Sequence, residues 1–218
     1  MENTSDSLSL SEQIQQWNAE HASEFPEEVQ RIFAAKTQEI IGSKLPDTCL
    51  STGDDAPDFA VTNTAGESIR LREKLERGPA ILSFYRGTWC PYCNIEFAAL
   101  LDQLPEFRSR KAAVLALSPQ VKERREDVVM VGFEDLCDRG NEVAHSYGLV
   151  YPLGEEIAKI YQGFGIHLES LNGDASLELP LPATYIVDRE AKIRYAYTSG
   201  DISERAEPSE LVDVLATI

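Results

Sequence analysis

The chain has 218 residues, enough for a substantial buried core, and its 43% hydrophobic and 26% charged residues are typical of a globular protein. Its formal net charge of −17 repels phosphate backbones and anionic lipid surfaces over a Debye length of about 8 Å, which argues against nucleic acid and membranes as partners. No apolar run approaches the roughly 20 residues that span a bilayer, and segment 1–11 lacks the basic and apolar regions of a secretory signal, so we expect a cytoplasmic protein.

The N-terminal part of the chain carries two helical patterns. Apolar residues recur at helical spacing over 10–17, after Ser7 or Ser9, either of which can cap a helix. A second such pattern, over 29–40, follows Pro26. These patterns predict an N-terminal helical arm.

The arm is followed by a change in composition. Segment 43–57 is rich in Gly, Pro, Asp, Ser and Thr and is typical of a linker. We therefore divide the chain into an arm with its linker, residues 1–50, and a second domain, residues 51–218. The amphipathic helices of the arm must cover either this domain or a second subunit, which leaves a homodimer open.

From residue 58 onward, short strands alternate with helices, which predicts an α/β sheet protein rather than a bundle or a sandwich. The strands are expected over 58–63, 68–71, 79–85, 112–118, 132–136, 182–188 and 192–198. The helices are expected near 91–104, 120–131, 141–147, 155–164 and 208–218. Segment 79–85 is apolar throughout, as in a strand that is buried on both faces.

Two cysteines, Cys90 and Cys93, directly follow that buried strand. Pro91 favours the first helical position, which would place Cys90 at the N-cap and Cys93 in the first turn. Unpaired N–H groups and the helix dipole favour a thiolate there. Because a separation of three helical residues brings the sulfurs within disulfide distance, we predict a reversible dithiol/disulfide centre. Arg86, four residues earlier, adds a positive charge or is an ordinary solvated ion-pair partner.

A zinc site and a cysteine hydrolase are the alternatives to a redox-active pair. A zinc site would need a second Cys or His pair, whereas Cys49, Cys137 and the three histidines are scattered singly, so we predict no metal and no cofactor. We expect Cys49 and Cys137 to be inert buried thiols. A cysteine hydrolase would need a histidine base, and neither His145 nor His167 is directed at the pair by its position in the sequence.

Several ordered segments resemble the peroxiredoxin-like branch of the alkyl hydroperoxide reductase and thiol-specific antioxidant family, within the thioredoxin-fold proteins. The matching segments are GDDAPDF (53–59), LSFYRGTWCPYCN (82–94), LALSPQ (115–120), DRGNEVAHSYGL (138–149) and ELPLPATYIVDREAKIRYAY (178–197). The resemblance implies a thioredoxin-like α/β fold, in which helices flank a central mixed sheet, here with an N-terminal helical extension.

The chain departs from the family at three positions. Typical members read F-Y-P-x-x-x-T-x-x-C, and an ungapped overlay on residues 84–93 places their peroxide-attacking cysteine at Cys93. The same overlay puts Arg86 in place of their proline and Cys90 in place of their threonine. Their peroxide-activating arginine would fall at or near Pro182.

What replaces these groups resembles thioredoxin. Residues 89–93, WCPYC, are similar to the W-C-x-x-C of thioredoxin-type reductases, and Leu181-Pro182 resembles their cis-proline loop. This resemblance implies that Trp89 and Pro182 flank the sulfurs and that Thr88 donates a hydrogen bond at the site. Alternatively, Trp89 belongs to the core and Pro182 starts a strand.

We therefore predict a thiol-dependent, antioxidant oxidoreductase. In a peroxidase, Cys93 would attack hydrogen peroxide or an organic hydroperoxide and the resulting sulfenic acid would condense with Cys90. In a disulfide oxidoreductase, Cys90 would attack a protein or small-molecule disulfide and Cys93 would resolve it. A thioredoxin- or glutathione-type reductant would restore either enzyme. A binding module or a non-redox pathway enzyme on the same fold remains a further alternative.

Overall fold

The computed structural model describes residues 8–121 and 132–218. Its N-terminal arm consists of α1 (Leu10–His21), a 3-10 turn η1 (Ala22–Glu24) and α2 (Glu27–Gly42). Helix α1 begins at Ser9, whose hydroxyl accepts the Glu12 N–H at 3.2 Å while the Glu12 carboxylate accepts the Ser9 N–H at 2.8 Å. The predicted helical arm is thus confirmed, with Ser9 as its cap. The segment predicted as a linker contains one short helix, α3 (Leu45–Thr48).

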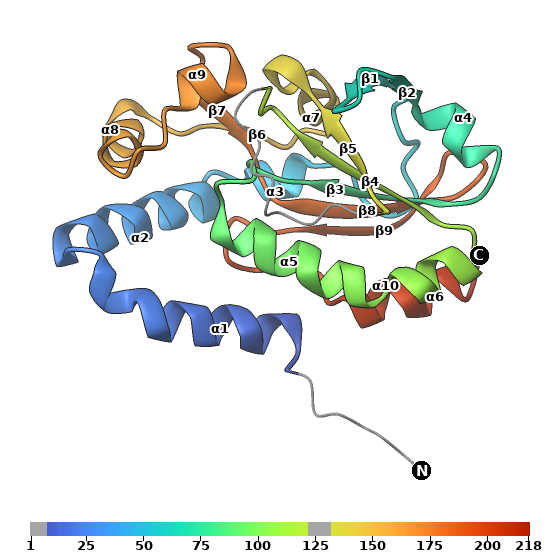
Figure 1. Cartoon of the computed structure of the whole chain (residues 1–218), viewed down its shortest axis with the longest axis horizontal. Helices are drawn as coiled ribbons and strands as arrows, with labels where there is room; N and C mark the ends of the chain where they lie inside the picture. Colours follow the sequence, from blue (N-terminus) through green and yellow to red (C-terminus); the bar gives the residue numbers. More distant parts are fainter. Residues whose placement is uncertain (1–7, 122–131) are drawn as a thin grey trace.

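Among the described residues, seven strands form one mixed sheet in the order β2-β1-β5-β4-β3-β8-β9 (Figure 1). Strands β3, β4 and β5 are parallel to one another, and the other pairs are antiparallel. The strands are β1 (Ala60–Asn63), β2 (Ser68–Arg70), β3 (Ala80–Phe84), β4 (Ala113–Ser118), β5 (Glu134–Cys137), β8 (Ala183–Val187) and β9 (Ile193–Thr198). This is the predicted mixed α/β sheet.

Helices cover both faces of this sheet (Figure 1). One face packs against α5 (Pro91–Asp102), α6 (Leu104–Ser109) and α10 (Pro208–Leu215). The other packs against α4 (Leu71–Leu75), α7 (Glu142–Ser146), α8 (Glu155–Gly163) and α9 (Leu168–Asn172). A second, two-stranded sheet pairs β6 (Val150–Pro152) with β7 (Glu178–Pro180), and a 3-10 turn η2 (Arg139–Asn141) precedes α7.

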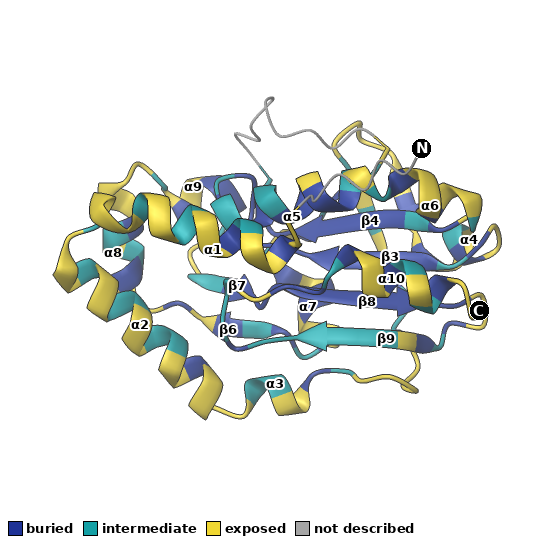
Figure 2. Cartoon of the chain, turned by 90° about the horizontal axis from the view of Figure 1, so that it is seen from below, coloured by how far each residue is buried: buried dark blue, intermediate teal, exposed yellow. Residues whose placement is uncertain are grey.

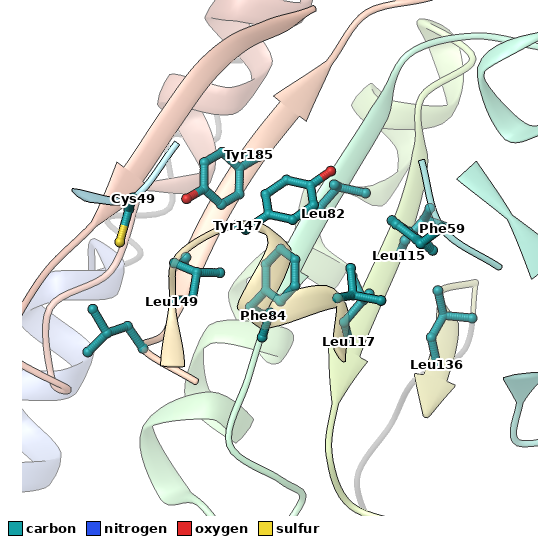
Figure 3. Close-up of a cluster of buried hydrophobic side chains, with 14 of the residues drawn as sticks. Cys49, Phe59, Leu82, Phe84, Leu115, Leu117, Leu136, Tyr147, Leu149 and Tyr185 are labelled. Carbon is teal, nitrogen blue, oxygen red and sulfur yellow. The ribbon is translucent and has the colours of Figure 1, made fainter. Parts of the chain in front are cut away.

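Strand β3 is buried along its whole length, as its apolar run predicts. Its side chains alternate between two cores: Leu82 and Phe84 face the α7 side, whereas Ile81 faces the α5 side. The Phe84 ring lies 5.1 Å from the ring of Tyr147 and 6.0 Å from that of Tyr185 (Figure 3). The strand that leads to the cysteine pair is therefore held on both faces.

The arm covers the sheet domain of its own chain. Leu10 and Ile14 of α1 pack against Ala99 of α5. The Glu207 carboxylate, just before α10, accepts the N–H groups of Leu10 and Ser11 at 2.9 and 2.8 Å. Figure 2 shows α1 beside α5. No helix in the described part of the chain is long and apolar enough to cross a membrane.

Most of the remaining predicted elements occur near their expected positions, but the helix expected at 120–131 lies largely outside the described residues. The elements that the sequence patterns did not predict are short: α3, α4, α6, α9, β6 and β7.

Candidate active site

The cysteine pair lies where β3 turns into α5. Gly87 makes this turn with φ +143°, and a Cβ atom there would lie 2.3 Å from the Trp89 indole nitrogen. Cys90 is the N-cap of α5, Pro91 is its first residue and Cys93 is in its first turn, as predicted. The turn therefore directs both sulfurs toward the N-terminal end of a helix.

The two thiols are completely buried and free, and they contact each other. Burial alone raises the pKa of Cys90, but the hydrogen bond from Cys93 and the positive charges of Arg86 and Arg205 outweigh it and lower this pKa to about 5. Burial, that same hydrogen bond and the negative charge on Cys90 raise the pKa of Cys93 well above its ordinary value. These directions favour Cys90 as the thiolate of the pair and Cys93 as the thiol.

Arg86 is buried, with 2% of its surface exposed, on the side of Cys90. It donates a hydrogen bond to the Tyr161 hydroxyl, and its guanidinium carbon lies 4.9 Å from the ring centre of Trp89 and 5.6 Å from that of Tyr161. Among the described residues, no carboxylate pairs with Arg86. Its charge is therefore not neutralised by a neighbouring acid in this part of the chain.

Arg205, from the segment between β9 and α10, lies on the side of Cys93. Its Nη2 is 3.8 Å from the Cys93 sulfur, and its Nε donates to the Glu96 carboxylate at 2.7 Å. Its Nη1 donates to the carbonyls of Ile202 and Glu204 at 2.5 and 2.7 Å. These contacts fix the guanidinium beside the sulfur.

Glu96 completes this buried group. It lies on α5, three residues after Cys93, and its other oxygen accepts hydrogen bonds from Ser83 and Thr184, both at 3.4 Å. Burial raises the pKa of Glu96, and the charge of Arg205 opposes that shift. Neither Arg205 nor Glu96 was identified from the sequence.

A cavity of about 350 Å³ is lined by Arg86, Trp89 and Pro91, the neighbours of Cys90, but by neither cysteine. The arm, the start of α5 and the end of α8 form its walls, with Trp17, Phe33, Trp89 and Phe164 among the residues that line it. Two contacts hold the arm there: Tyr92 donates to the Asn18 side chain at 2.7 Å, and the Trp17 and Tyr92 rings lie 5.2 Å apart. The arm is thus a wall of the site.

Two further residues predicted for the site, Thr88 and Pro182, are both buried. The Thr88 hydroxyl donates to the Gln120 side chain at 3.1 Å, as does its N–H at 2.8 Å. Pro182 is buried directly before β8 and is not among the described residues that line the cavity. The expected cis bond is wrong, because the Leu181–Pro182 peptide is trans. Its position matches the alternative, a proline that precedes a strand.

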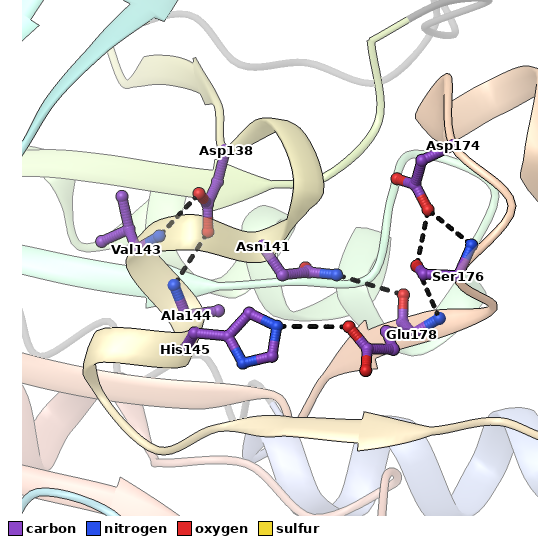
Figure 4. Close-up of polar contacts among 8 residues, drawn as sticks. All are labelled: Asp138, Asn141, Val143, Ala144, His145, Asp174, Ser176 and Glu178. Carbon is purple, nitrogen blue, oxygen red and sulfur yellow. Dashed lines mark hydrogen bonds and ion pairs between the residues drawn. The ribbon is translucent and has the colours of Figure 1, made fainter.

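His145, Cys49 and Cys137 lie outside this site, whereas His21 lines the cavity. His145, on α7, pairs with Glu178 at 3.2 Å (Figure 4). The Asp138 carboxylate accepts hydrogen bonds from the Val143 and Ala144 N–H groups at the start of the same helix. Cys49 is buried and bonded to backbone carbonyls, and burial raises its pKa to about 11. Cys137 is only half-buried, in β5. No group of three or more potential metal ligands occurs within residues 8–121 and 132–218.

A hydrogen-bonded dithiol at the N-terminus of a helix, directly after a central strand of a mixed sheet, defines a thioredoxin-fold thiol oxidoreductase. The chain belongs to the AhpC/TSA family, whose model matches residues 52–196. It is a peroxiredoxin-like, thiol-dependent enzyme, as the resemblance implied.

Curated relatives include both peroxiredoxins and disulfide oxidoreductases. The putative peroxiredoxin bcp of Buchnera aphidicola is 32% identical over 126 residues, which cover 56% of this chain and 77% of the relative. The thiol-disulfide oxidoreductase ResA of Bacillus subtilis is 27% identical over 144 residues, which cover 66% of this chain and 65% of ResA.

Solved structures show the same fold. The peroxidoxin BcpB of Mycobacterium tuberculosis superposes with a TM-score of 0.60 at 21% identity and covers 78% of this chain and 98% of its own. A yeast mitochondrial 1-Cys peroxiredoxin, described with its thiol resolved via glutathione and thioredoxin systems, has a TM-score of 0.56 at 21% identity, with coverages of 77% and 75%.

Proposed function

We propose that the chain reduces hydrogen peroxide or organic hydroperoxides through a Cys90–Cys93 dithiol/disulfide cycle. The observation that carries this proposal is the pair of free, buried cysteines at the N-terminus of α5, with the Arg205 guanidinium 3.8 Å from the Cys93 sulfur. The positive charges of Arg86 and Arg205 lower the pKa of Cys90, which supports it. A thiolate is the form of cysteine that attacks a peroxide or a disulfide.

The charges favour Cys90 as the attacking sulfur, whereas the family overlay pointed to Cys93. The Cys90 thiolate attacks one peroxide oxygen, the O–O bond breaks, and the leaving alkoxide or hydroxide takes up a proton to depart as alcohol or water. Cys90 is then a sulfenic acid, oxidised by two electrons. The Cys93 thiol attacks its sulfur, water leaves, and a disulfide forms.

Oxidation of Cys90 changes the charges around Cys93 in a way that favours the second step, the attack of Cys93 on the Cys90 sulfenic acid. The negative charge on Cys90 and its hydrogen bond both raise the pKa of Cys93. The negative charge disappears once Cys90 is oxidised to a neutral sulfenic acid, whereas the Arg205 guanidinium, 3.8 Å from the Cys93 sulfur in the reduced protein, keeps its charge. The pKa of Cys93 then falls, and its thiolate becomes accessible for disulfide formation.

Regeneration requires either a thioredoxin-type dithiol or two glutathione-type thiols, which supply two electrons and two protons. The related yeast peroxiredoxin, resolved via such systems, supports this part of the proposal.

A second candidate function is disulfide exchange, which the WCPYC motif and the similarity to ResA favour. Both mechanisms begin at Cys90 and end in the same disulfide. The complete burial of the sulfurs behind the arm favours a small substrate over a protein disulfide.

Three assays on wild type, Cys90→Ser and Cys93→Ser test these alternatives: hydroperoxide consumption, reduction of insulin disulfides, and a thiol count before and after one equivalent of hydroperoxide. A peroxidase loses two thiols per equivalent in the wild type. Cys90→Ser should abolish turnover, and Cys93→Ser should stop at a Cys90 sulfenic acid that dimedone traps. Reduction of insulin without peroxide consumption would favour disulfide exchange. Wild-type rates of peroxide consumption or insulin reduction in both Cys90→Ser and Cys93→Ser would exclude both dithiol mechanisms.

A further inference from the structure

Two buried N–H donors at the cavity beside Cys90 have no acceptor among the described residues: the Nε of Arg86 and the Nε1 of Trp89. Arg86 is 2% exposed and lacks a carboxylate partner in this part of the chain. Burying a donor without an acceptor costs about 1–3 kcal/mol, and a buried charge without a counter-ion costs more. Donors left in this state beside a cavity indicate a ligand that supplies oxygen acceptors and negative charge.

The rest of the cavity is apolar and aromatic. Trp17, Phe25 and Phe33 come from the arm, and Phe164, which is 46% exposed, comes from the end of α8. Its volume of about 350 Å³ lies at the lower end of the range for small-molecule pockets, roughly 300–1,000 Å³. This wall suits a ring or a short hydrocarbon chain.

Three of the other polar side chains at the cavity, those of Asn18, His21 and Asp201, are engaged with protein partners. Asn18 accepts from Tyr92, and the His21 ring stacks on Trp17 at 4.4 Å. The Asp201 carboxylate accepts the Ser203 N–H and hydroxyl at 2.9 and 2.7 Å. Asp201 is the one acid that lines the cavity within the described residues. Because its carboxylate already accepts hydrogen bonds within its own turn, it repels a bound anion less than a carboxylate without partners would.

We propose that this cavity binds a small organic carboxylate with an apolar body, its carboxylate on Arg86 and its body among the aromatic side chains of the arm. The inference rests on the proposed function in one respect: the peroxide or disulfide group that the enzyme reduces would be part of this carboxylate ligand. Binding itself requires no turnover.

The position of Arg86 makes this binding depend on the redox state. Arg86 is the cation that faces Cys90 on the cavity side, so the bound carboxylate and the Cys90 thiolate compete for one positive charge. By thermodynamic linkage, the carboxylate binds more tightly when Cys90 is in a disulfide, and its binding raises the pKa of Cys90 in the reduced protein.

The test compares 4-phenylbutyrate with the neutral 4-phenylbutan-1-ol, two probes of the same body, by calorimetry at pH 7. With oxidised wild type we expect the carboxylate to bind about tenfold more tightly than the alcohol, the size of a charged hydrogen bond. Arg86→Met should remove this preference and leave binding of the alcohol unchanged. Phe33→Ala should weaken both probes alike.

Arg110→Met, which removes an arginine of α6 paired with Glu106, is the matched control and should change nothing. Arg86→Lys keeps the charge and should keep a preference for the carboxylate if Arg86→Met does not fold. Equal affinity for the two probes, no binding of either, or a preference that survives in Arg86→Met would overturn the proposal. Binding without peroxide or disulfide turnover would sink the proposed function instead and leave this site standing.

Discussion

The two sulfurs lie between two different surroundings. On the Cys90 side, which we call the open side, Arg86 has aromatic neighbours, no carboxylate partner among the described residues, and a cavity bordered by the arm. On the Cys93 side, which we call the closed side, Arg205 is bound to Glu96 and to two backbone carbonyls, and Glu96 is bound in turn to the sheet.

This difference shows that an arginine near a cysteine acts according to what else it binds. The charge of Arg205 is largely neutralised by Glu96, so its main effect is to hold a donor at a fixed place beside Cys93. The charge of Arg86 remains directed to the Cys90 thiolate or to a ligand.

The largest effect on stability should come from breaking the Arg205–Glu96 pair of the closed side. Arg205→Met leaves the Glu96 carboxylate, which is 3% exposed, buried without its cation, and should lower the free energy of unfolding by about 3–5 kcal/mol. Urea unfolding of the reduced protein measures it. The double variant Glu96→Gln/Arg205→Met should recover much of the loss, and Arg86→Met should cost less because it orphans no carboxylate. A loss below about 1 kcal/mol in Arg205→Met would refute this account of the pair.

A smaller loss is expected from the turn that carries the open side. Gly87→Ala adds a Cβ at φ +143°, 2.3 Å from the Trp89 nitrogen and 2.8 Å from the Gln120 oxygen, and should cost about 2–3 kcal/mol by thermal unfolding. Gly66→Ala, at φ +84° with no atom within 4 Å, isolates the backbone strain and should cost about 1 kcal/mol. Equal losses in the two variants would show that the Trp89 contact is unimportant.

The charge on the open side should appear in the reactivity of Cys90. Because its pKa is lowered to about 5, Cys90 is a thiolate above that pH, and its alkylation by iodoacetamide should slow as the pH falls through 5. Arg86→Met should raise the midpoint by about one unit or more, and Arg110→Met should not move it. Mass spectrometry assigns the modified cysteine. A midpoint near 8.5 in the wild type would remove the basis for Cys90 as the nucleophile.

The smallest effect concerns the arm. Ser9→Ala removes the cap of α1 and should cost about 1 kcal/mol of helix stability. A loosened α1 should let a bulky maleimide modify Cys90 faster, whereas Ser109→Ala, at the end of α6, should leave that rate unchanged. Unchanged labelling in Ser9→Ala, despite the lost stability, would mean that α1 does not control access to the cavity.

The sequence predicts the open side better than the closed side. Arg86, Trp89, Cys90 and Cys93 lie within eight residues of one strand–turn–helix unit, so their proximity follows from local rules. Arg205 meets Cys93 across 112 positions, and no periodic pattern indicates that contact.

One signal for the closed side was present in the sequence. Glu96 lies on the buried face of α5, together with Cys93, Phe97 and Leu100. A carboxylate at such a position needs a buried cation or several donors, so its presence indicates a partner without naming it. The short helices and the β6–β7 pair were missed for another reason, since three to six residues are too few to show a period.

The bonds from Glu207 to Leu10 and Ser11 span 197 and 196 positions of the chain. During synthesis, α1 therefore emerges from the ribosome long before the residue that anchors it. The contacts of α1 with Tyr92 and Ala99 can form earlier than this anchor, so the outer wall of the dithiol pocket is completed in two stages as the chain is synthesised.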